Sequence, residues 1–204
     1  WARSPVDRVL VACVAGDATR EHVIRCAARF SLPAPEFVLT PQDGRGKGIT
    51  IGYRDPAQLG VDRYLAMLGA RVRYPAGAIV VDVGTAVTVD AVDGEGVHRG
   101  GAIIPGIGLM HDALARGTRG VRVPRGASKA LFGRDTAECV AIGTLRAVAG
   151  GIESLVESMT TGLGSRPQLV LTGGDAPAVE PLLKGRYHRH PDLVLEGLAI
   201  HAGI

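Results

Sequence analysis

The stretch 78–106 constrains the fold of this chain more than any other segment. Residues 78–92 form a nearly continuous run of β-branched and small apolar residues, which is typical of strands buried on both faces of a sheet. The sequence Asp-Gly-Glu-Gly at 93–96 is a strong hairpin turn signal before a second apolar run. One polar corner, Asp-x-Gly-Thr at 82–85, interrupts the first run. We therefore predict a three-stranded antiparallel meander with this corner at one tip.

The polar corner has the residue types of a phosphate site. Burying the carboxylate of Asp82 is costly unless it binds something. Gly84 permits a tight turn and the close approach of a ligand, and Thr85 adds a hydroxyl. Backbone N–H groups and a hydroxyl at such a turn suit phosphate oxygens, and the carboxylate suits a cation that offsets the phosphate charge. The tetrapeptide alone leaves open a hairpin whose polar side chains satisfy only local backbone groups.

A second pattern lies upstream, where Gly-Val-Asp-Arg at 60–63 begins an amphipathic segment. Its apolar residues fall at helical spacing: Val61, Leu65 and Leu68, with Gly69 expected near the helix end. Arg63 in the first turn is unfavourable to the helix dipole, so it needs a partner. That partner is either a surface salt bridge or a bound anion, and in the second case Asp62 is placed to act as a base.

Together the two patterns resemble the type III pantothenate kinases of the actin-like, sugar-kinase-like ATPase superfamily. The pattern from Tyr53 to Ala70 is similar to the substrate motif of that family. The run 81–90 and the later Gly-Gly-x-Ile-x-Pro-Gly at 100–106 are similar to its second domain. With Gly-Arg-x-Thr at 133–136 and Thr-Gly-Gly-Asp after the predicted strand 168–172, the resemblance covers nearly all of the chain.

The resemblance implies an α/β fold with two related subdomains in the actin-like arrangement, here at 1–72 and 73–204. It implies ATP-dependent phosphorylation of pantothenate, the first step of coenzyme A synthesis. Phosphoryl transfer asks the protein mainly for positioning and charge stabilisation. Members of the family are dimers with the site near the interface, so we expect a homodimer.

The resemblance also implies roles for particular residues. Asp62 is expected to be the base, and Arg63 to bind the pantothenate carboxylate through its bidentate fork. The remaining expected contacts are Tyr53, Gly60, Val61 and Thr136 for pantothenate, Gly84, Thr85, Gly173 and Gly174 for ATP, and Asp82 for potassium or ammonium. Magnesium is expected to accompany ATP. Two structural alternatives stay open: a helix cap at Thr136 and a plain tight turn at 173–174.

One motif of the family has no match. Its first phosphate hairpin, Asp-x-Gly-Asn-Thr near the N-terminus, does not occur in this sequence. We therefore expect the first subdomain to be truncated, with residues 9–14 at the edge of an incomplete sheet or covered by another element. An alternative function stays open, a non-catalytic regulatory relative, because some close relatives of these kinases are named as accessory factors for transcription.

Composition limits the partners. The chain has 204 residues, of which 46% are hydrophobic and 4% aromatic, so an aliphatic core in α/β layers is favoured. A net charge of +3 with dispersed arginines argues against nucleic acid. Three distant cysteines argue against a disulfide framework or a zinc site. No apolar run reaches the ~18 residues of a membrane span, so we expect a cytoplasmic protein without a membrane partner.

The remaining elements are predicted from periodicity and breakers. We expect strands at 8–15, 36–40, 49–53 and 168–172, helices at 18–30, 106–117, 137–162, 176–184 and 193–202, a basic loop at 118–126 and a polar connection at 187–190. Asp17 or Thr19 is expected to cap the first helix, and Asp135 or Thr136 the long one.

Overall fold

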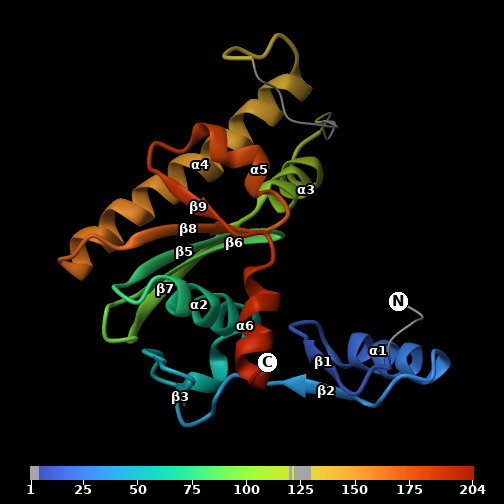
Figure 1. Ribbon diagram of the computed structural model, residues 1–204. Coiled ribbons are helices and arrows are strands. Elements are labelled where there is room, and N and C mark those ends of the chain that lie inside the picture. Colours follow the sequence, from blue (N-terminus) through green and yellow to red (C-terminus); the bar gives the residue numbers. More distant parts are fainter. Residues whose placement is uncertain (1–4, 120, 122–129) are drawn as a thin grey trace.

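The computed structural model describes residues 5–119, 121 and 130–204 (Figure 1). Its centre is a five-stranded sheet in the order β7-β6-β5-β8-β9. The strands are β5 (Ala78–Val83), β6 (Ala86–Val92), β7 (His98–Pro105), β8 (Gln168–Thr172) and β9 (Tyr187–Arg189). The first three strands are antiparallel, while β8 pairs parallel to β5 and β9 parallel to β8. The predicted meander is confirmed, and its turn closes through a bond from Gly96 N–H to Asp93 O.

Helices cover both faces of this sheet (Figure 1). On one face lie α2 (Val61–Arg73) and α6 (Leu193–Ala202), packed against inward residues such as Val80 and Val170. On the other face lie α4 (Thr136–Leu163) and the short α5 (Ala176–Val179), packed against Ile79, Val81 and Leu171. The central strands β5 and β6 are largely buried on both sides, as their continuous β-branched sequence predicts. The α/β class is confirmed.

Two glycines allow α2 and α6 to pack closely. A Cβ on Gly197 would lie 1.9 Å from the carbonyl oxygen of Leu65, and one on Gly69 would lie 2.8 Å from that of Leu193. Gly69 was expected near the end of its helix, but α2 continues to Arg73. The glycine serves helix packing and not termination, and tertiary contact compensates for its low helix propensity.

The N-terminal part forms a separate small sheet. Strands β1 (Val9–Ala12) and β2 (Pro35–Val38) pair in parallel around α1 (Asp17–Arg29), and among the described residues β1 has no other strand partner. The strand lies at the edge of this small sheet, in agreement with one of the two expected positions, and all of its residues are half-buried. The predicted side-chain cap of α1 is wrong, because Gly16 occupies the N-cap without a side-chain hydrogen bond.

The remaining short elements connect these layers. The strands β3 (Arg45–Gly46) and β4 (Ile49–Thr50) form a small hairpin, and a 3₁₀ turn, η1 (Pro56–Gln58), is capped by Asp55 before α2. Helix α3 (Ile107–Gly117) follows β7. The helix predicted at 176–184 is shorter, since α5 passes into the 3₁₀ turn η2 (Glu180–Leu182). The basic loop at 118–126 lies mostly outside the described residues.

Two further predictions meet different outcomes. The polar connection predicted at 187–190 is wrong, because β9 pairs there with β8. The cap of α4 is confirmed at Asp135, whose carboxylate accepts a bond of 2.8 Å from Glu138 N–H, so Thr136 is the first helical residue. By length and composition α4 could cross a membrane, yet here it packs on the sheet through residues such as Val148 and Ile152.

Candidate active site

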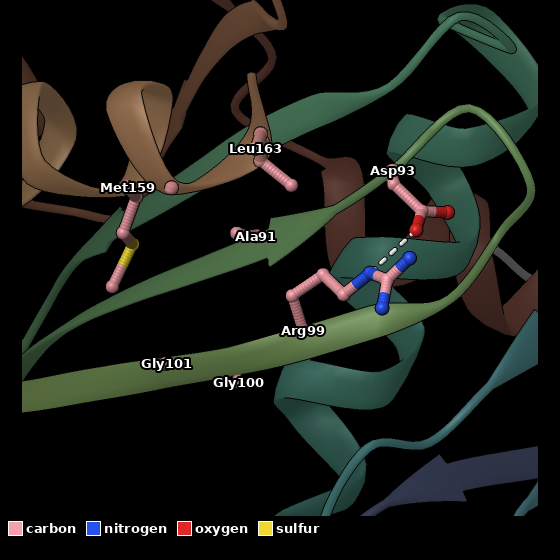
Figure 2. Close-up of a pocket in the computed structure, with 8 residues that line it drawn as sticks. Ala91, Asp93, Arg99, Gly100, Gly101, Met159 and Leu163 are labelled. Atoms are coloured by element: carbon pink, nitrogen blue, oxygen red, sulfur yellow. Dashed lines mark hydrogen bonds and ion pairs between the residues drawn. The ribbon is translucent and has the colours of Figure 1, made fainter. Parts of the chain in front are cut away.

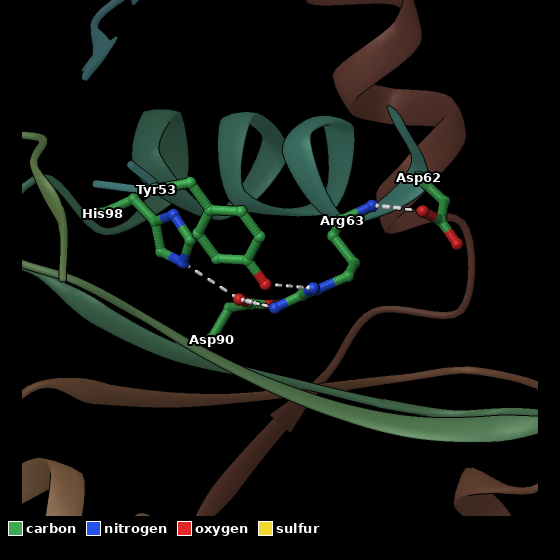
Figure 3. A network of polar contacts seen from close by, with 5 residues as sticks. All are labelled: Tyr53, Asp62, Arg63, Asp90 and His98. Atoms are coloured by element: carbon green, nitrogen blue, oxygen red, sulfur yellow. Dashed lines mark hydrogen bonds and ion pairs between the residues drawn. The ribbon is translucent and has the colours of Figure 1, made fainter. Parts of the chain in front are cut away.

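A buried polar network lies where α2 meets the sheet (Figure 3). Arg63 comes from the first turn of α2, Asp90 from β6, His98 from the start of β7 and Tyr53 from the loop after β4. The side chains of Arg63, Asp90 and His98 are 7%, 2% and 0% exposed. Ionised groups this deeply buried are stable only when they are paired and fully hydrogen-bonded.

The network satisfies that requirement at the carboxylate. Arg63 Nε donates to Asp90 Oδ2 at 2.8 Å and Arg63 Nη2 to Asp90 Oδ1 at 2.6 Å. His98 Nε2 lies 3.0 Å from Asp90 Oδ1. Burial opposes ionisation of Asp90, but the hydrogen bonds from His98 and Arg63 outweigh it and hold its pKa below the usual range. Asp90 is therefore the anionic centre of the network.

Arg63 has a partner, as the sequence requires, but this partner is Asp90, a buried carboxylate of the same chain. The ion pair is buried and internal, so the surface salt bridge is wrong. The edge of the guanidinium formed by Nε and Nη2 is occupied by Asp90, so in this structure the bidentate fork is not open to a ligand. Its Nη1 donates to the hydroxyl of Tyr53 at 2.8 Å. Arg63 thus links Tyr53 to the sheet.

Asp62 points away from this network (Figure 3). Its Oδ1 accepts a bond of 2.8 Å from the backbone N–H of the next residue, Arg63. The position at the helix start explains this contact, because the first backbone N–H groups of a helix have no intrahelical acceptor. The carboxylate is only partly buried, and its second oxygen has no hydrogen bond within the described part of the chain.

Asp82 lies at the polar corner between β5 and β6. Within the described residues its carboxylate has no hydrogen bond or ion pair, unlike that of Asp90. Burial, together with the charges of Asp62 and Asp90, raises the pKa of Asp82 to about 6. An unpaired, half-buried carboxylate is suited to bind a cation.

The corner opens into a cavity of about 300 Å³. Residues from β5, β8, β9 and the segments after them line it: Asp82, Thr172, Gly173, Gly174, Pro177, Arg189, Pro191 and Val194. Gly173 has a φ of +99°, and a Cβ there would lie 2.5 Å from Asp82 Oδ1. The structure therefore brings together three predicted residues, Asp82, Gly173 and Gly174. No side chain other than glycine would fit at the first of the two glycines.

Gly84 and Thr85 form the turn beside Asp82. Gly84 N–H donates to Ala86 O at 3.1 Å, and Gly106 N–H donates to Thr85 O at 3.0 Å. A Cβ on Gly106 would lie 2.2 Å from Gly84 O, so the start of α3 packs directly on the turn. The Thr85 side chain is exposed, with its hydroxyl free of hydrogen bonds within the described residues. The start of α3 therefore supports the turn, while the Thr85 side chain stays exposed.

Thr136 lies elsewhere. It lines an apolar cavity of about 540 Å³ between α3 and α4, which includes Met110, Leu114, Val140 and Ala147. None of the other predicted site residues lines this cavity. Within one chain, the structure does not join Thr136 to the Asp62 and Asp82 region.

Another cavity, of about 610 Å³, lies between β6, β7 and the end of α4 (Figure 2). At its rim Arg99 Nε donates to Asp93 Oδ2 at 2.6 Å, while Met159 and Leu163 form an apolar side. No predicted site residue lines it, and it lacks the free carboxylate and open turn found at Asp82. We therefore do not place the candidate site there.

Asp90 and His98 lie beside the candidate site, and neither of them was predicted from the sequence as a site residue. A signal existed for Asp90, because it is a carboxylate inside a β-branched strand. His98 carried no such signal, since its contact with Asp90 depends on the pairing of β6 and β7.

Comparison with known proteins agrees with this architecture. A Campylobacter jejuni structure described as a conserved putative Baf family transcriptional activator superposes with a TM-score of 0.60 at 20% identity, over 94% of this chain and 79% of that one, so the two chains share a fold. The family model for type III pantothenate kinase matches residues 2–158. A type III pantothenate kinase of Polaromonas is 38% identical over 97% of this chain and 78% of its own length. One of Alkalilimnicola ehrlichii is 41% identical over 95% and 77%. The chain therefore belongs to the type III pantothenate kinase family.

Proposed function

We propose that this protein transfers the γ-phosphoryl group of ATP to the primary hydroxyl of pantothenate, the first step of coenzyme A synthesis, in the cytoplasm. Family membership supports the substrates. The structural observation that carries the proposal is the carboxylate of Asp82, which has no partner among the described residues and lines one cavity together with Gly173 and Gly174.

Asp62 is the proposed base. Its Oδ1 is held by a backbone N–H, which leaves Oδ2 to accept the proton of the pantothenate hydroxyl. Gly60 and Val61 precede it at the start of α2 and would form the wall of the substrate pocket with Tyr53. Because the fork of Arg63 is occupied by Asp90, we propose that Arg63 acts on pantothenate through its remaining N–H groups and through Tyr53.

The nucleotide would lie across the Asp82 corner. The turn at Gly84 and the exposed hydroxyl of Thr85 suit the approach of phosphate oxygens, and Gly173 and Gly174 leave room for the adenosine part. Asp82 would hold a potassium or ammonium ion, and a cation there would offset phosphate charge. Magnesium would accompany ATP as its usual counterion.

The function is tested with protein expressed from the complete natural gene. We expect ADP release that depends on both ATP and pantothenate, with phosphopantothenate identified by mass spectrometry. Binding of both ligands without product would favour the regulatory alternative. Binding of neither would remove both proposals.

We further propose a homodimer that uses the apolar groove between α3 and α4. Ala147 is exposed in this groove, and Ala147→Glu would place a charge on it. We expect sedimentation velocity to show a shift from dimer to monomer and, because Thr136 lines the same groove, a weaker affinity for pantothenate. Ser154→Glu on the same helix, outside the groove, is the matched control. An Ala147→Glu variant that stays dimeric would place the interface elsewhere.

A further inference from the structure

We infer that Asp90 and His98 are positioning residues for the pantothenate site: they lock Arg63 against the sheet and, through it, hold the Tyr53 hydroxyl at the site. The inference rests on the proposed function and adds two residues that neither contact the phosphates nor act as the base. Figure 3 shows Asp90 together with Arg63, His98 and Tyr53.

The contacts form a closed ring. Asp90 accepts two bonds from Arg63, and Arg63 Nη1 donates to Tyr53 Oη at 2.8 Å. His98 Nε2 bonds Asp90 Oδ1 at 3.0 Å. The ring of His98 stacks on that of Tyr53, with centroids 5.5 Å apart and planes at 30°. Each member is therefore held by two others, and displacement of one side chain disturbs the next.

The hydrogen-bond roles follow from the acceptor. An ionised carboxylate can only accept, so the hydrogen lies on His98 Nε2. His98 Nδ1 is buried and has no partner among the described residues. In this tautomer His98 Nε2–H is the third donor to Asp90, and the buried, unpaired Nδ1 of His98 is an acceptor. His98 thus fixes the carboxylate oxygen that also binds Arg63 Nη2.

Two glycines confine the network. A Cβ on Gly101 would lie 2.2 Å from Asp90 Oδ1 and 2.6 Å from Arg63 Nη2, and one on Gly52 would lie 1.9 Å from His98 O. Neither glycine has a positive φ, so the requirement at both positions is close approach and not backbone conformation. The backbone of β7 therefore covers the ion pair directly and leaves no space for a side chain.

The network does more than pack the core, because it also contacts residues of the proposed site. A buried ion pair is weak evidence for stability, since apolar residues of similar volume often serve as well. Here the guanidinium ends on a hydroxyl that lies outside the sheet, and the same residue holds Asp62 through its backbone N–H. Arg63 thus contacts two residues of the proposed site, Tyr53 through its guanidinium and Asp62 through its backbone N–H.

The test compares His98→Phe with His98→Gln. The glutamine amide can donate to Asp90 from the place of Nε2, whereas phenylalanine keeps a ring for Tyr53 but removes the donor. Loss of one bond to a buried charge predicts that His98→Phe raises KM for pantothenate by about 10-fold or more, with KM for ATP within about twofold. We expect His98→Gln to stay within about threefold of the parent. His22→Phe, at an exposed position in α1, is the control.

A second readout does not depend on turnover. With ¹³C-labelled tyrosine, the Tyr53 Cζ resonance, assigned through Tyr53→Phe, should shift in His98→Phe, which keeps a ring against Tyr53 but loses the donor to Asp90. An unmoved resonance in His98→Phe would overturn the inference whether or not the protein phosphorylates pantothenate. Equal rises in both KM values would also overturn it, because they would indicate general loss of structure. An inactive parent with a shifted resonance would refute only the proposed function.

Discussion

Asp62→Asn is expected to lower kcat by about 10²-fold or more while pantothenate affinity stays within a few fold. Asparagine keeps an oxygen for the Arg63 N–H and nearly the same shape, so the start of α2 should remain intact. It cannot accept the proton of the attacking hydroxyl. The loss should therefore fall on turnover and not on ground-state binding.

The measurement pairs ADP release with calorimetric titration of pantothenate. Asp17→Asn, an exposed aspartate in the first turn of α1, is the matched control and should leave both quantities unchanged. An Asp62→Asn variant within about threefold of the parent in kcat would show that another group takes the proton, or that none is needed.

Much of the central fold could be predicted because its signals are local. The β-branched run 78–92, the turn at 93–96 and the cap at Asp135 each act within a few residues, and each is found where the sequence places it. The strand β9 was missed for the opposite reason. Its Tyr-His-Arg sequence has little strand character, and only pairing with β8 makes it a strand.

The residues of the candidate site fall into the same two groups, those with a local sequence signal and those whose contacts depend on tertiary packing. The corner at Asp82 was predicted, since a carboxylate and a glycine inside an apolar run are visible in sequence. The partner of Arg63 was not, because Asp90 lies 27 residues away and the contact depends on how α2 packs on β6. The raised pKa of Asp82 likewise depends on burial and on the charges of Asp62 and Asp90, which are set by the tertiary structure. The two-part division at residue 72 stays a prediction, although α2, which spans that boundary, packs against α6.

Asp82→Asn is expected to abolish the response to potassium and most of the activity, and at the same time to raise Tm at about pH 7. Burial and two neighbouring carboxylates hold the pKa of Asp82 at about 6, against an ordinary value of 3.8. Near pH 7 the group is ionised in both states, so the folded protein carries an unfavourable buried charge without a partner. A shift of about two pH units corresponds to up to roughly 3 kcal/mol, which asparagine would recover.

The sign of the pH dependence follows from the raised pKa. As pH falls from about 6 toward 4, the folded state takes up the proton before the unfolded state does, so the destabilisation by Asp82 fades. The Tm gain of Asp82→Asn should therefore be present at about pH 7 and absent near pH 4. Activity of the parent should fall below about pH 6, because a protonated Asp82 cannot hold a cation.

Asp93→Asn supplies the opposite case, in the turn between β6 and β7. Although burial opposes it, bonds from Val97 N–H, Arg99 and Glu95 N–H lower the pKa of Asp93, so its ionised form stabilises the fold. We expect Asp93→Asn to lower Tm at about pH 7, while potassium still raises both Tm and turnover. Differential scanning calorimetry with and without potassium measures both variants. Asp82 is not the cation ligand if Asp82→Asn is no more stable than the parent near pH 7, or if the variant keeps its potassium response. Removal of an unpaired buried carboxylate should raise Tm, and removal of a cation ligand should abolish the response to potassium.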